Sequence, residues 1–352
     1  MKPVIVFVHL GKNKAPILND VARAASKTAL DTEVLLLTDN PEDHREFPGT
    51  VLFYDRNTRS ASFKRFISKN RELQGVAGGY WLFAIERILA LKALEHYVSL
   101  QTPVIHFESD VLSLMDTVTI IDICEKVRRT SVPRFSDDLG IGSVLVSPSV
   151  SKLMGDLSIL EEILISNPEI RDDMHLLGHA LNANLIEELP SRPLDSHFNL
   201  VNPLYNWIFD GAAIGQYLLG RDPIHNGGLR VSGYLNPDFG VDLRECRFEI
   251  SSEGNSKIDR LFLSNGDTRL QVLNLHIHSK DPVTELHKNS DFWKQVIDAA
   301  NKGYQLKSDT PVPDLIHSNR NTIVNRFRII RRIGMREYLR RALSSKGWFG
   351  EE

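Results

Sequence analysis

The first half of the chain alternates short apolar runs with segments of helical periodicity, and this alternation restricts the folds that it can adopt. The apolar runs have the length of strands, and the segments between them repeat their apolar residues at helical spacing. We therefore expect strands at residues 3–10, 33–38, 50–54 and 103–107 and helices at residues 15–30 and 80–97. Strands that alternate with helices predict an α/β fold with a mostly parallel central sheet and helices on its faces.

The second half of the chain has a less regular pattern. We expect further strands at residues 142–146, 247–250, 260–263 and 270–278, and helices at residues 151–166 and 207–219. A long loop with three prolines occupies residues 190–206, and residues 220–233 are rich in glycine. Because the pattern is helical from about residue 281, we predict a main domain at residues 1–285 and a helical C-terminal extension at residues 286–352.

Composition and charge exclude several classes of protein. With 42% hydrophobic and 25% charged residues in a length of 352, the chain has an ordinary globular composition. Two cysteines are too few for a disulfide framework or a zinc cluster, so we expect a reducing, cytoplasmic compartment. The net charge of −3 argues against a dedicated nucleic-acid binder, and no run approaches the roughly 20 apolar residues that span a bilayer.

Two carboxylates directly follow the apolar run at residues 103–107. Glu108 and Asp110 are spaced i, i+2, and apolar residues resume at Val111. Because alternate residues of a strand point to one face, both carboxylates could reach one cation. Buried acids are costly without a cation, and Mg²⁺ or Mn²⁺ prefers oxygen ligands. The pattern predicts a divalent-metal site that holds a diphosphate; the alternative is an exposed turn after the strand.

Asp39 ends another predicted strand, and a histidine pair ends a late one. Ligands of open α/β sheets bind beyond the carboxyl ends of strands, so Asp39 is a candidate for nucleotide binding. Alternation along residues 272–280 places His276, His278 and Lys280 on one face. One imidazole could complete a metal site, and Lys280 could neutralise a phosphate. The alternative is a pair of core histidines.

Asp210 and Arg87 are further candidates on predicted helices. Asp210 precedes Gly211 and other small residues that let a ligand come close, so it is either a ligand-binding or catalytic carboxylate or a helix N-cap. Arg87 lies in a helix that is apolar almost all round and is therefore largely buried. A buried arginine needs an anionic partner. Glu86 or Glu95 would give it a structural role, whereas Asp110 or a bound nucleotide would give it a functional one.

Residues 320–346 form a basic segment. They carry nine lysines and arginines and one acid, with apolar residues interleaved at roughly helical spacing. A basic amphipathic helix of this kind can lie on an anionic membrane surface. The alternatives are a helix that packs on the main domain and a site for an anionic acceptor.

The order of these motifs resembles that of the GT-A-fold nucleotide-sugar-dependent glycosyltransferases. The similarity is to the glycogenin-like and bacterial galactosyltransferase group and to bacterial or viral polysaccharide glycosyltransferases, and it covers about residues 3–280. It implies a GT-A-like, Rossmann-type sheet. It also implies that the Glu108–Asp110 motif replaces the family's DxD motif, that a late histidine (His276 or His278) is a further metal ligand, and that Lys280 and Arg87 contact the donor. Asp39 and Gly211 complete the donor site, and Asp210 is the catalytic candidate.

The predicted function is a glycosyltransferase that depends on Mn²⁺ or Mg²⁺. It moves a hexose-type sugar from a nucleoside-diphosphate donor, UDP-sugar in preference to GDP-sugar, to a saccharide or lipid-linked acceptor in surface polysaccharide or glycolipid synthesis. An inverting reaction would use Asp210 as the base, and a retaining one would place it beside the anomeric carbon. The basic segment would hold the protein at the cytoplasmic face of the membrane. The alternatives are a sugar-phosphate nucleotidyltransferase and a non-catalytic protein that binds carbohydrate or a membrane surface.

Overall fold

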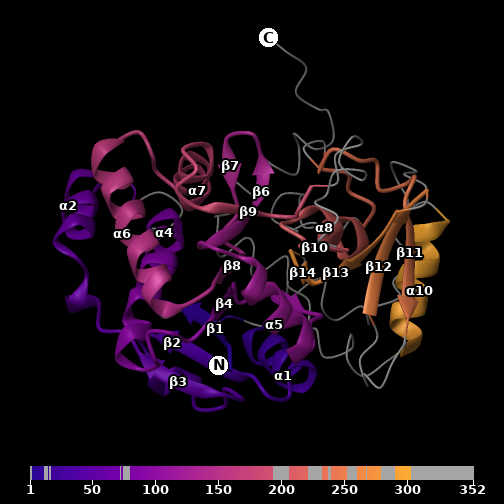
Figure 1. Ribbon diagram of the computed structural model, residues 1–352, viewed down its shortest axis with the longest axis horizontal. Helices are drawn as coiled ribbons and strands as arrows, with labels where there is room; N and C mark the ends of the chain where they lie inside the picture. The colour runs from indigo at the N-terminus through magenta and orange to yellow at the C-terminus, as the bar shows by residue number, and fades with distance from the viewer. Residues whose placement is uncertain are drawn as a thin grey trace, which may run out of the picture.

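A mixed sheet forms the centre of the molecule (Figure 1). The structure, a computed structural model, is described for residues 2–11, 15, 17–71, 73, 80–192, 206–220, 232–236, 239–251, 260–266, 268–278 and 290–302. The strand order of the central sheet is β3-β2-β1-β4-β8-β6-β7, and β9 pairs with β6. The bounds of these strands are β1 (Val4–His9), β2 (Glu33–Thr38), β3 (Thr50–Phe53), β4 (Val104–Phe107), β6 (Ser131–Ser136), β7 (Leu139–Gly140), β8 (Val144–Ser147) and β9 (Glu187–Leu189).

The first four strands of this sheet are parallel, as the sequence predicts. β1 pairs with both β2 and β4, and β2 pairs with β3. Their carboxyl ends therefore lie at one edge of the sheet. β8 corresponds to the predicted strand at residues 142–146, but it runs antiparallel to β4. The sheet is thus parallel on one side and mixed on the other.

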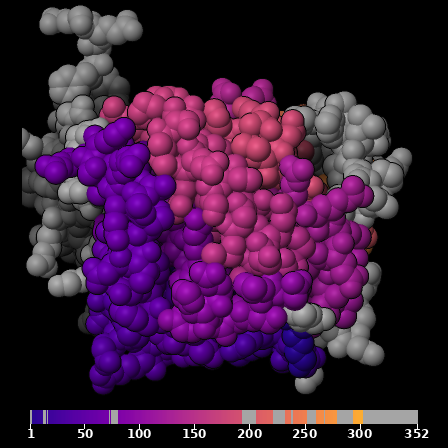
Figure 2. Space-filling view, turned by 60° about the vertical axis from the view of Figure 1, so that its left-hand side comes forward, coloured from indigo at the N-terminus to yellow at the C-terminus, as the bar shows by residue number. Residues whose placement is uncertain are grey.

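Helices cover both faces of the central sheet. They are α1 (Leu18–Thr28) and α5 (Thr117–Lys126) on one face and α2 (Ala61–Lys69), α4 (Tyr80–Ala90), α6 (Val150–Ser166) and α7 (Asp173–Asn182) on the other. Alternate residues of β1 join the two cores, Phe7 with α1 and Val6 with α4. Burial on both faces explains why β1, β2 and β4 are mostly apolar and do not alternate with polar residues. In Figure 2 the violet surface of the N-terminal segments borders the magenta and pink surface of the later helices.

In the described part of the chain, short 3₁₀ segments follow two strands and one helix. They are Pro41–His44, Arg56–Thr58 and Leu91–His96. The last of them continues α4, so the helix predicted at residues 80–97 is α-helical only as far as Ala90.

A second, four-stranded sheet is built from the later part of the chain. Its order is β10-β13-β12-β11, and a separate two-stranded ribbon pairs β14 with β5. The bounds are β5 (Val111–Ser113), β10 (Trp207–Ile208), β11 (Arg247–Ser251), β12 (Arg260–Asn265), β13 (Thr268–Val272) and β14 (Asn274–His276), with helices α8 (Ala213–Leu219) and α10 (Ser290–Asn301). α10 packs on β11 and α8 and lies beside β11 at the right of Figure 1.

Two elements of this part differ from the sequence prediction. The helix expected at residues 207–219 starts only at Ala213, after the short strand β10. The strand expected at residues 270–278 is divided into β13 and β14. The Asn274 side chain bonds both backbone groups of Asp210, at 3.0 and 2.9 Å. These side-chain bonds replace ladder pairing, and β14 turns away to pair with β5.

Several predicted features lie outside the described residues. They are Lys280, most of the loop at residues 190–206, most of the segment at residues 220–233 and the basic segment at residues 320–346. The boundary at residue 285 stays a prediction. No helix in the described ranges is long and apolar enough to cross a membrane.

An ion pair links the second sheet to helix α5, and we expect it to make the stability of the protein depend on pH. Arg260 donates to Asp116, the N-cap of α5, at 2.7 Å, and Thr119 donates to the same carboxylate. Burial acts to raise the pKa of Asp116, but the hydrogen bonds from Thr119 and the charge of Arg260 outweigh it and lower the pKa. The stabilisation is therefore present above the unfolded-state pKa of about 4 and is lost as pH falls through the folded-state pKa.

We expect Asp116→Asn to lower the free energy of unfolding by about 1 kcal/mol at pH 7, a modest cost because both partners are partly solvated. Asparagine still caps the helix, so the difference from wild type reports the charge. Urea unfolding at pH 7 and at a pH of about 3 measures it. A difference that is the same at both pH values would contradict this origin.

Candidate active site

Glu108 and Asp110 lie at the carboxyl end of β4, in the tight turn that leads into β5. The Glu108 amide donates to the Ser143 carbonyl at 2.9 Å, and the Val111 amide donates to the Glu108 carbonyl at 3.1 Å. The two acids therefore lie in a turn. The expectation that they lie on one face of a strand is wrong, because β4 ends at Phe107. The turn still directs both carboxylates to the same point, and their side chains are only 13% and 16% exposed.

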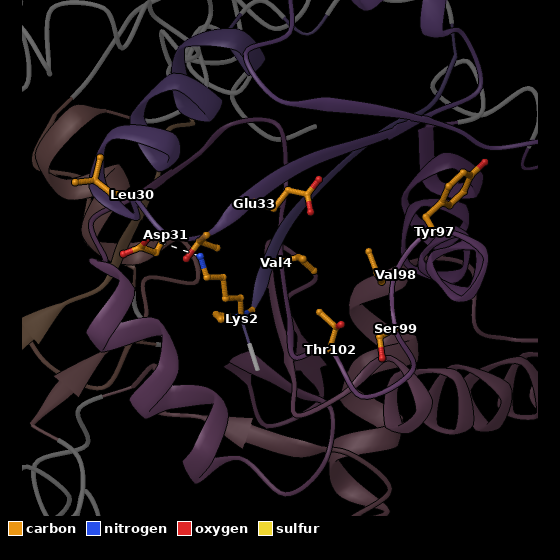
Figure 3. A pocket seen from close by; sticks show the side chains of 11 residues that line it. Lys2, Val4, Leu30, Asp31, Glu33, Tyr97, Val98, Ser99 and Thr102 are labelled. Carbon is orange, nitrogen blue, oxygen red and sulfur yellow. Dashed lines mark ion pairs between the residues drawn. The ribbon is translucent and has the colours of Figure 1, made fainter.

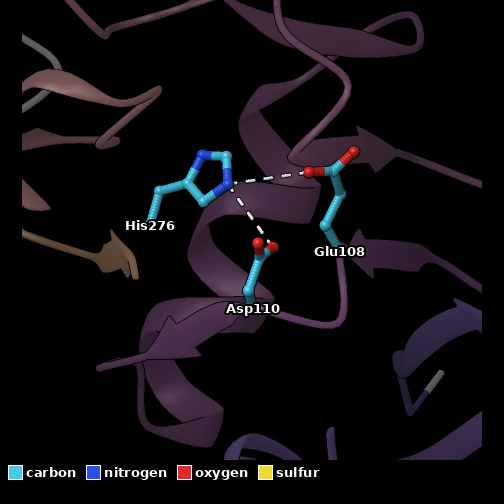
Figure 4. A group of neighbouring side chains, drawn as sticks. All are labelled: Glu108, Asp110 and His276. Carbon is cyan, nitrogen blue, oxygen red and sulfur yellow. Dashed lines mark ion pairs between the residues drawn. The ribbon is translucent and has the colours of Figure 1, made fainter. Parts of the chain in front are cut away.

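His276, the last residue of β14, lies next to these carboxylates although it is far from them in sequence (Figure 4). Its Nε2 lies 3.7 Å from Glu108 Oε2 and 3.4 Å from Asp110 Oδ1. One ligand atom from each of the three residues lies within 4.8 Å of the other two. Two carboxylates and an imidazole are a donor set that suits Mn²⁺ or Mg²⁺. The predicted convergence of residues from the middle and the end of the chain is present in the structure.

The orientation of His276 is fixed by residues 210 and 211. Its Nδ1 donates to the Gly211 carbonyl at 2.8 Å, and its backbone amide donates to Asp210 Oδ2 at 2.9 Å. The Gly211 carbonyl can only accept, so Nδ1 carries the proton and Nε2 faces the acids. Burial alone would lower the pKa of His276, but the charges of Asp110 and Glu108 raise it to about 9.

Asp210 is completely buried. Its carboxylate accepts hydrogen bonds from the backbone amides of Ile214 at 2.9 Å, Gly215 at 2.7 Å and His276 at 2.9 Å. Burial raises the pKa of Asp210, and these amides act against the shift. The geometry supports the capping alternative, because the carboxylate joins the start of α8 to the end of β14. Its catalytic role stays a prediction.

His278 stacks beside the site. Its ring centroid is 4.1 Å from that of His276, with the planes tilted by 34°. The three-residue group that could hold a metal contains His276. Ligation by His278 stays a prediction, and the geometry gives His278 a packing contact with the ring of His276.

Arg87 pairs with Glu108, which is not among the partners considered from sequence. Glu86 instead accepts hydrogen bonds from Arg59 Nε and Nη2, at 2.5 and 2.7 Å. Burial acts to lower the pKa of Arg87, but Glu108 and Tyr80 outweigh it and raise the pKa, so the guanidinium stays charged. A permanent cation therefore lies directly beside the candidate metal site.

Asp39 shapes the neighbouring strand ends. Its carboxylate accepts the Gly11 amide at 2.9 Å and lies 2.8 Å from Arg56 Nε. It thus joins the ends of β1 and β2 to the 3₁₀ segment after β3. The structure places Asp39 at the same edge of the sheet as Glu108, as expected from parallel strands.

Two groups near Glu108 are not predicted from sequence. Burial and the charges of Glu108 and Asp110 raise the pKa of Tyr80 to about 12, and Arg87 acts against them. Burial and the charge of Glu108 raise the pKa of Asp173 to about 6, and Arg87 again opposes the shift. Asp173 lies at the start of α7, and the only sequence signal for it is an acid in a helical first turn.

An open hollow of about 520 Å³ lies at the other end of the sheet (Figure 3). It is lined by the starts of β1 and β2, with Lys2, Glu33 and Tyr97 among its residues. Lys2 and Asp31 form an exposed pair there at 3.8 Å. Among the described residues, the group of three potential metal ligands lies elsewhere, at Glu108, Asp110 and His276, and ligands of such sheets bind at the carboxyl ends of strands. We therefore assign the functional site to the Glu108 edge.

No protein-family model matches this chain, and no curated protein matches it in sequence. Solved structures similar to the chain include glycosyltransferases. PaToxG glycosyltransferase is 10% identical over 52% of this chain and 69% of that one, with a TM-score of 0.35. Galactosyltransferase LgtC, in complex with donor and acceptor sugar analogues, is 11% identical over 57% and 79%, with a TM-score of 0.36. Mouse xyloside xylosyltransferase 1 is 10% identical over 54% and 85%, with a TM-score of 0.36. Scores this low give the likenesses no weight for function, which has to come from the side chains of the site.

Proposed function

We propose that this chain is a metal-dependent glycosyltransferase that uses a nucleoside-diphosphate sugar. The observation that carries the proposal is the convergence of Glu108, Asp110 and His276 beside Arg87 at the carboxyl edge of the central sheet. Three nearly buried ligands with two negative charges suit a divalent cation. A cationic arginine next to them suits a phosphate. A sugar-nucleotide donor carries a diphosphate that binds a divalent metal, so a site of this kind suits such a donor.

Glu108, Asp110 and His276 would hold Mn²⁺ or Mg²⁺. The bound metal would stabilise the negative charge of the departing nucleoside diphosphate. Arg87 would then contact phosphate oxygens, with Glu108 shared between it and the metal. Asp210 and Gly211 keep His276 in place and hold a proton on Nδ1, so that Nε2 is the nitrogen that a metal would bind in exchange for its proton.

The remaining roles follow from position and sequence pattern. Asp39, which organises the ends of β1 and β2, would lie at the nucleoside end of the donor site. Lys280 would neutralise a phosphate. The donor is a UDP-sugar in preference to a GDP-sugar, and the acceptor is a saccharide or a lipid-linked saccharide of a surface polysaccharide or glycolipid. The basic segment at residues 320–346 would bring the protein to an anionic membrane face.

A thermal-shift screen of UDP- and GDP-sugars, with and without Mn²⁺, tests this function. A ligand that binds only the folded state at 100 times its Kd stabilises it by about 2.7 kcal/mol. We expect at least one sugar nucleotide to raise the melting temperature with Mn²⁺ and not with EDTA. Transfer assays then distinguish release of nucleoside diphosphate from release of pyrophosphate, which would indicate a nucleotidyltransferase. A broad panel without any Mn²⁺-dependent shift would rule the proposed function out.

A further inference from the structure

The exposed face of α2 carries cations and no acid. The exposed cations are Lys64, Arg65, Lys69 and, just after the helix, Arg71. Each of the other helices of eight or more residues in the described ranges contains at least one Asp or Glu. The face of α2 is therefore locally basic, although the whole chain has a net charge of −3.

These four cations form no ion pair with a carboxylate of the described residues. Arg56 and Arg59, which precede α2, pair with Asp39 and Glu86. Lys64, by contrast, donates to a neutral acceptor, the Asn57 carbonyl, at 2.7 Å. Like charges repel at the spacing i, i+4, which separates residues 65 and 69. An anionic partner would relieve this repulsion.

The position of α2 makes this charged face accessible. The helix lies at the outer left edge of the molecule in Figure 1, on the face of the central sheet opposite α1. Phe63 and Phe66 are buried and stack with their ring centroids 6.2 Å apart, so they hold the helix against the core. Because α2 follows β3 through Arg56–Thr58, it begins at the carboxyl edge of the sheet, which also carries Glu108.

We propose that the basic face of α2 docks on the anionic surface of a phospholipid membrane. Guanidinium and ammonium groups donate hydrogen bonds to phosphate oxygens, and the negative potential of an anionic leaflet attracts each of them. Cations that project outward from a helix suit an extended anionic surface, whereas a single small anion needs groups that converge on it. This contact is separate from the one proposed for residues 320–346, and it does not depend on the proposed function.

The double variant Arg65→Gln/Lys69→Gln tests the proposal in the full chain. Co-sedimentation would compare vesicles of phosphatidylcholine alone with vesicles that contain about one-third phosphatidylglycerol. We expect wild type to bind the anionic vesicles and not the neutral ones. Since each basic residue near an anionic surface contributes about fivefold in affinity, we expect the double variant to bind about thirtyfold more weakly.

The double variant Arg23→Gln/Lys27→Gln is the matched control. Its two residues are exposed on α1 at the same i, i+4 spacing, and the substitutions change the net charge by the same amount. Asp20 lies beside Arg23 at 3.3 Å, so this face is not purely basic. We expect the control to bind anionic vesicles within about twofold of wild type. Glutamine is a good helix former at exposed positions, and urea unfolding checks that both variants keep their stability.

Several results would overturn the proposal. Wild type that fails to bind anionic vesicles, or that binds neutral ones equally well, would show that no anionic membrane attracts the protein. Equal losses in the two double variants would mean that only net charge matters, and unchanged binding of the α2 variant would mean that α2 does not face the membrane. Tighter binding of soluble polygalacturonate than of vesicles, lost in the α2 variant, would assign the face to an acidic polymer. None of these assays contains a sugar nucleotide, so their outcome leaves the test of the proposed function untouched.

Discussion

Asp110→Asn is expected to lower metal-dependent sugar transfer by about a thousandfold or more. A catalytic metal contributes several kcal/mol of charge stabilisation, and each 1.36 kcal/mol corresponds to about tenfold in rate. Asp110 lies 3.4 Å from His276 Nε2 and supplies one of the two carboxylates of the site. An amide keeps one oxygen but lacks the charge that holds the cation. Initial rates over a Mn²⁺ titration, at saturating sugar nucleotide, measure the loss.

The fold should tolerate this substitution. The Asp110 carbonyl accepts the Ile277 amide at 2.8 Å, and asparagine leaves this backbone bond intact. Asp122→Asn is the matched control, because Asp122 is a half-exposed acid of α5 paired with Lys126 at 2.7 Å. We expect the control to keep the wild-type rate and metal dependence. A variant at residue 110 that retained more than about a tenth of the wild-type rate would contradict a metal site at Glu108.

The central strands could be predicted from sequence because burial on both faces leaves a local signature. β1, β2 and β4 are apolar at almost every position, and β2 has the predicted bounds. β1 and β2 end at the polar residues His9 and Thr38, and the polar residue Glu108 follows β4. This regularity is a property of neighbouring residues, so periodicity alone detects it.

The pairing of β5 with β14 could not be predicted in the same way. It joins His276 to Val111 across a long separation in sequence, and each strand has only three residues. Strands this short have no periodicity to read. The division of the predicted strand at residues 270–278 depends on Asn274, whose side chain bonds the backbone of Asp210. These partners are defined only once the chain has folded.

The residue types of the site could be predicted, whereas their partners could not. Carboxylates at a strand end and a late histidine indicate metal chemistry wherever the turn places them. The pairing of Arg87 with Glu108 depends on how α4 packs against the sheet. Asp173 lies against Gly142, near the backbone that bonds Glu108, only once α7 has packed in place. Long-range packing thus decides which of several available acids are functional candidates.

Gly215→Ala is expected to destabilise the protein by about 3 kcal/mol or more, because it forces α8 away from β14. An added Cβ would lie 2.2 Å from the His276 carbonyl oxygen and 2.8 Å from Asp210 Oδ2. Both neighbours are held by backbone hydrogen bonds and cannot rotate away. Separation of α8 from β14 would also break the hydrogen bond that the Gly215 amide donates to Asp210, and it would displace His276. Urea unfolding measures the loss of stability, and Mn²⁺ titration measures the accompanying loss of metal affinity.

Gly155→Ala provides the matched control within α6. Gly155 lies in the middle of α6 on its solvent-exposed side, and no atom lies within 4 Å of a Cβ added there. Alanine there should stabilise the protein by about 0.5–1 kcal/mol, since it removes the entropic cost of a helical glycine. The same chemical change is therefore expected to act with opposite signs at the two positions. If both variants unfolded at the same urea concentration, α8 would not lie as close to His276 as it does in the structure. The contact with α8 would then not be what holds the His276 imidazole in place.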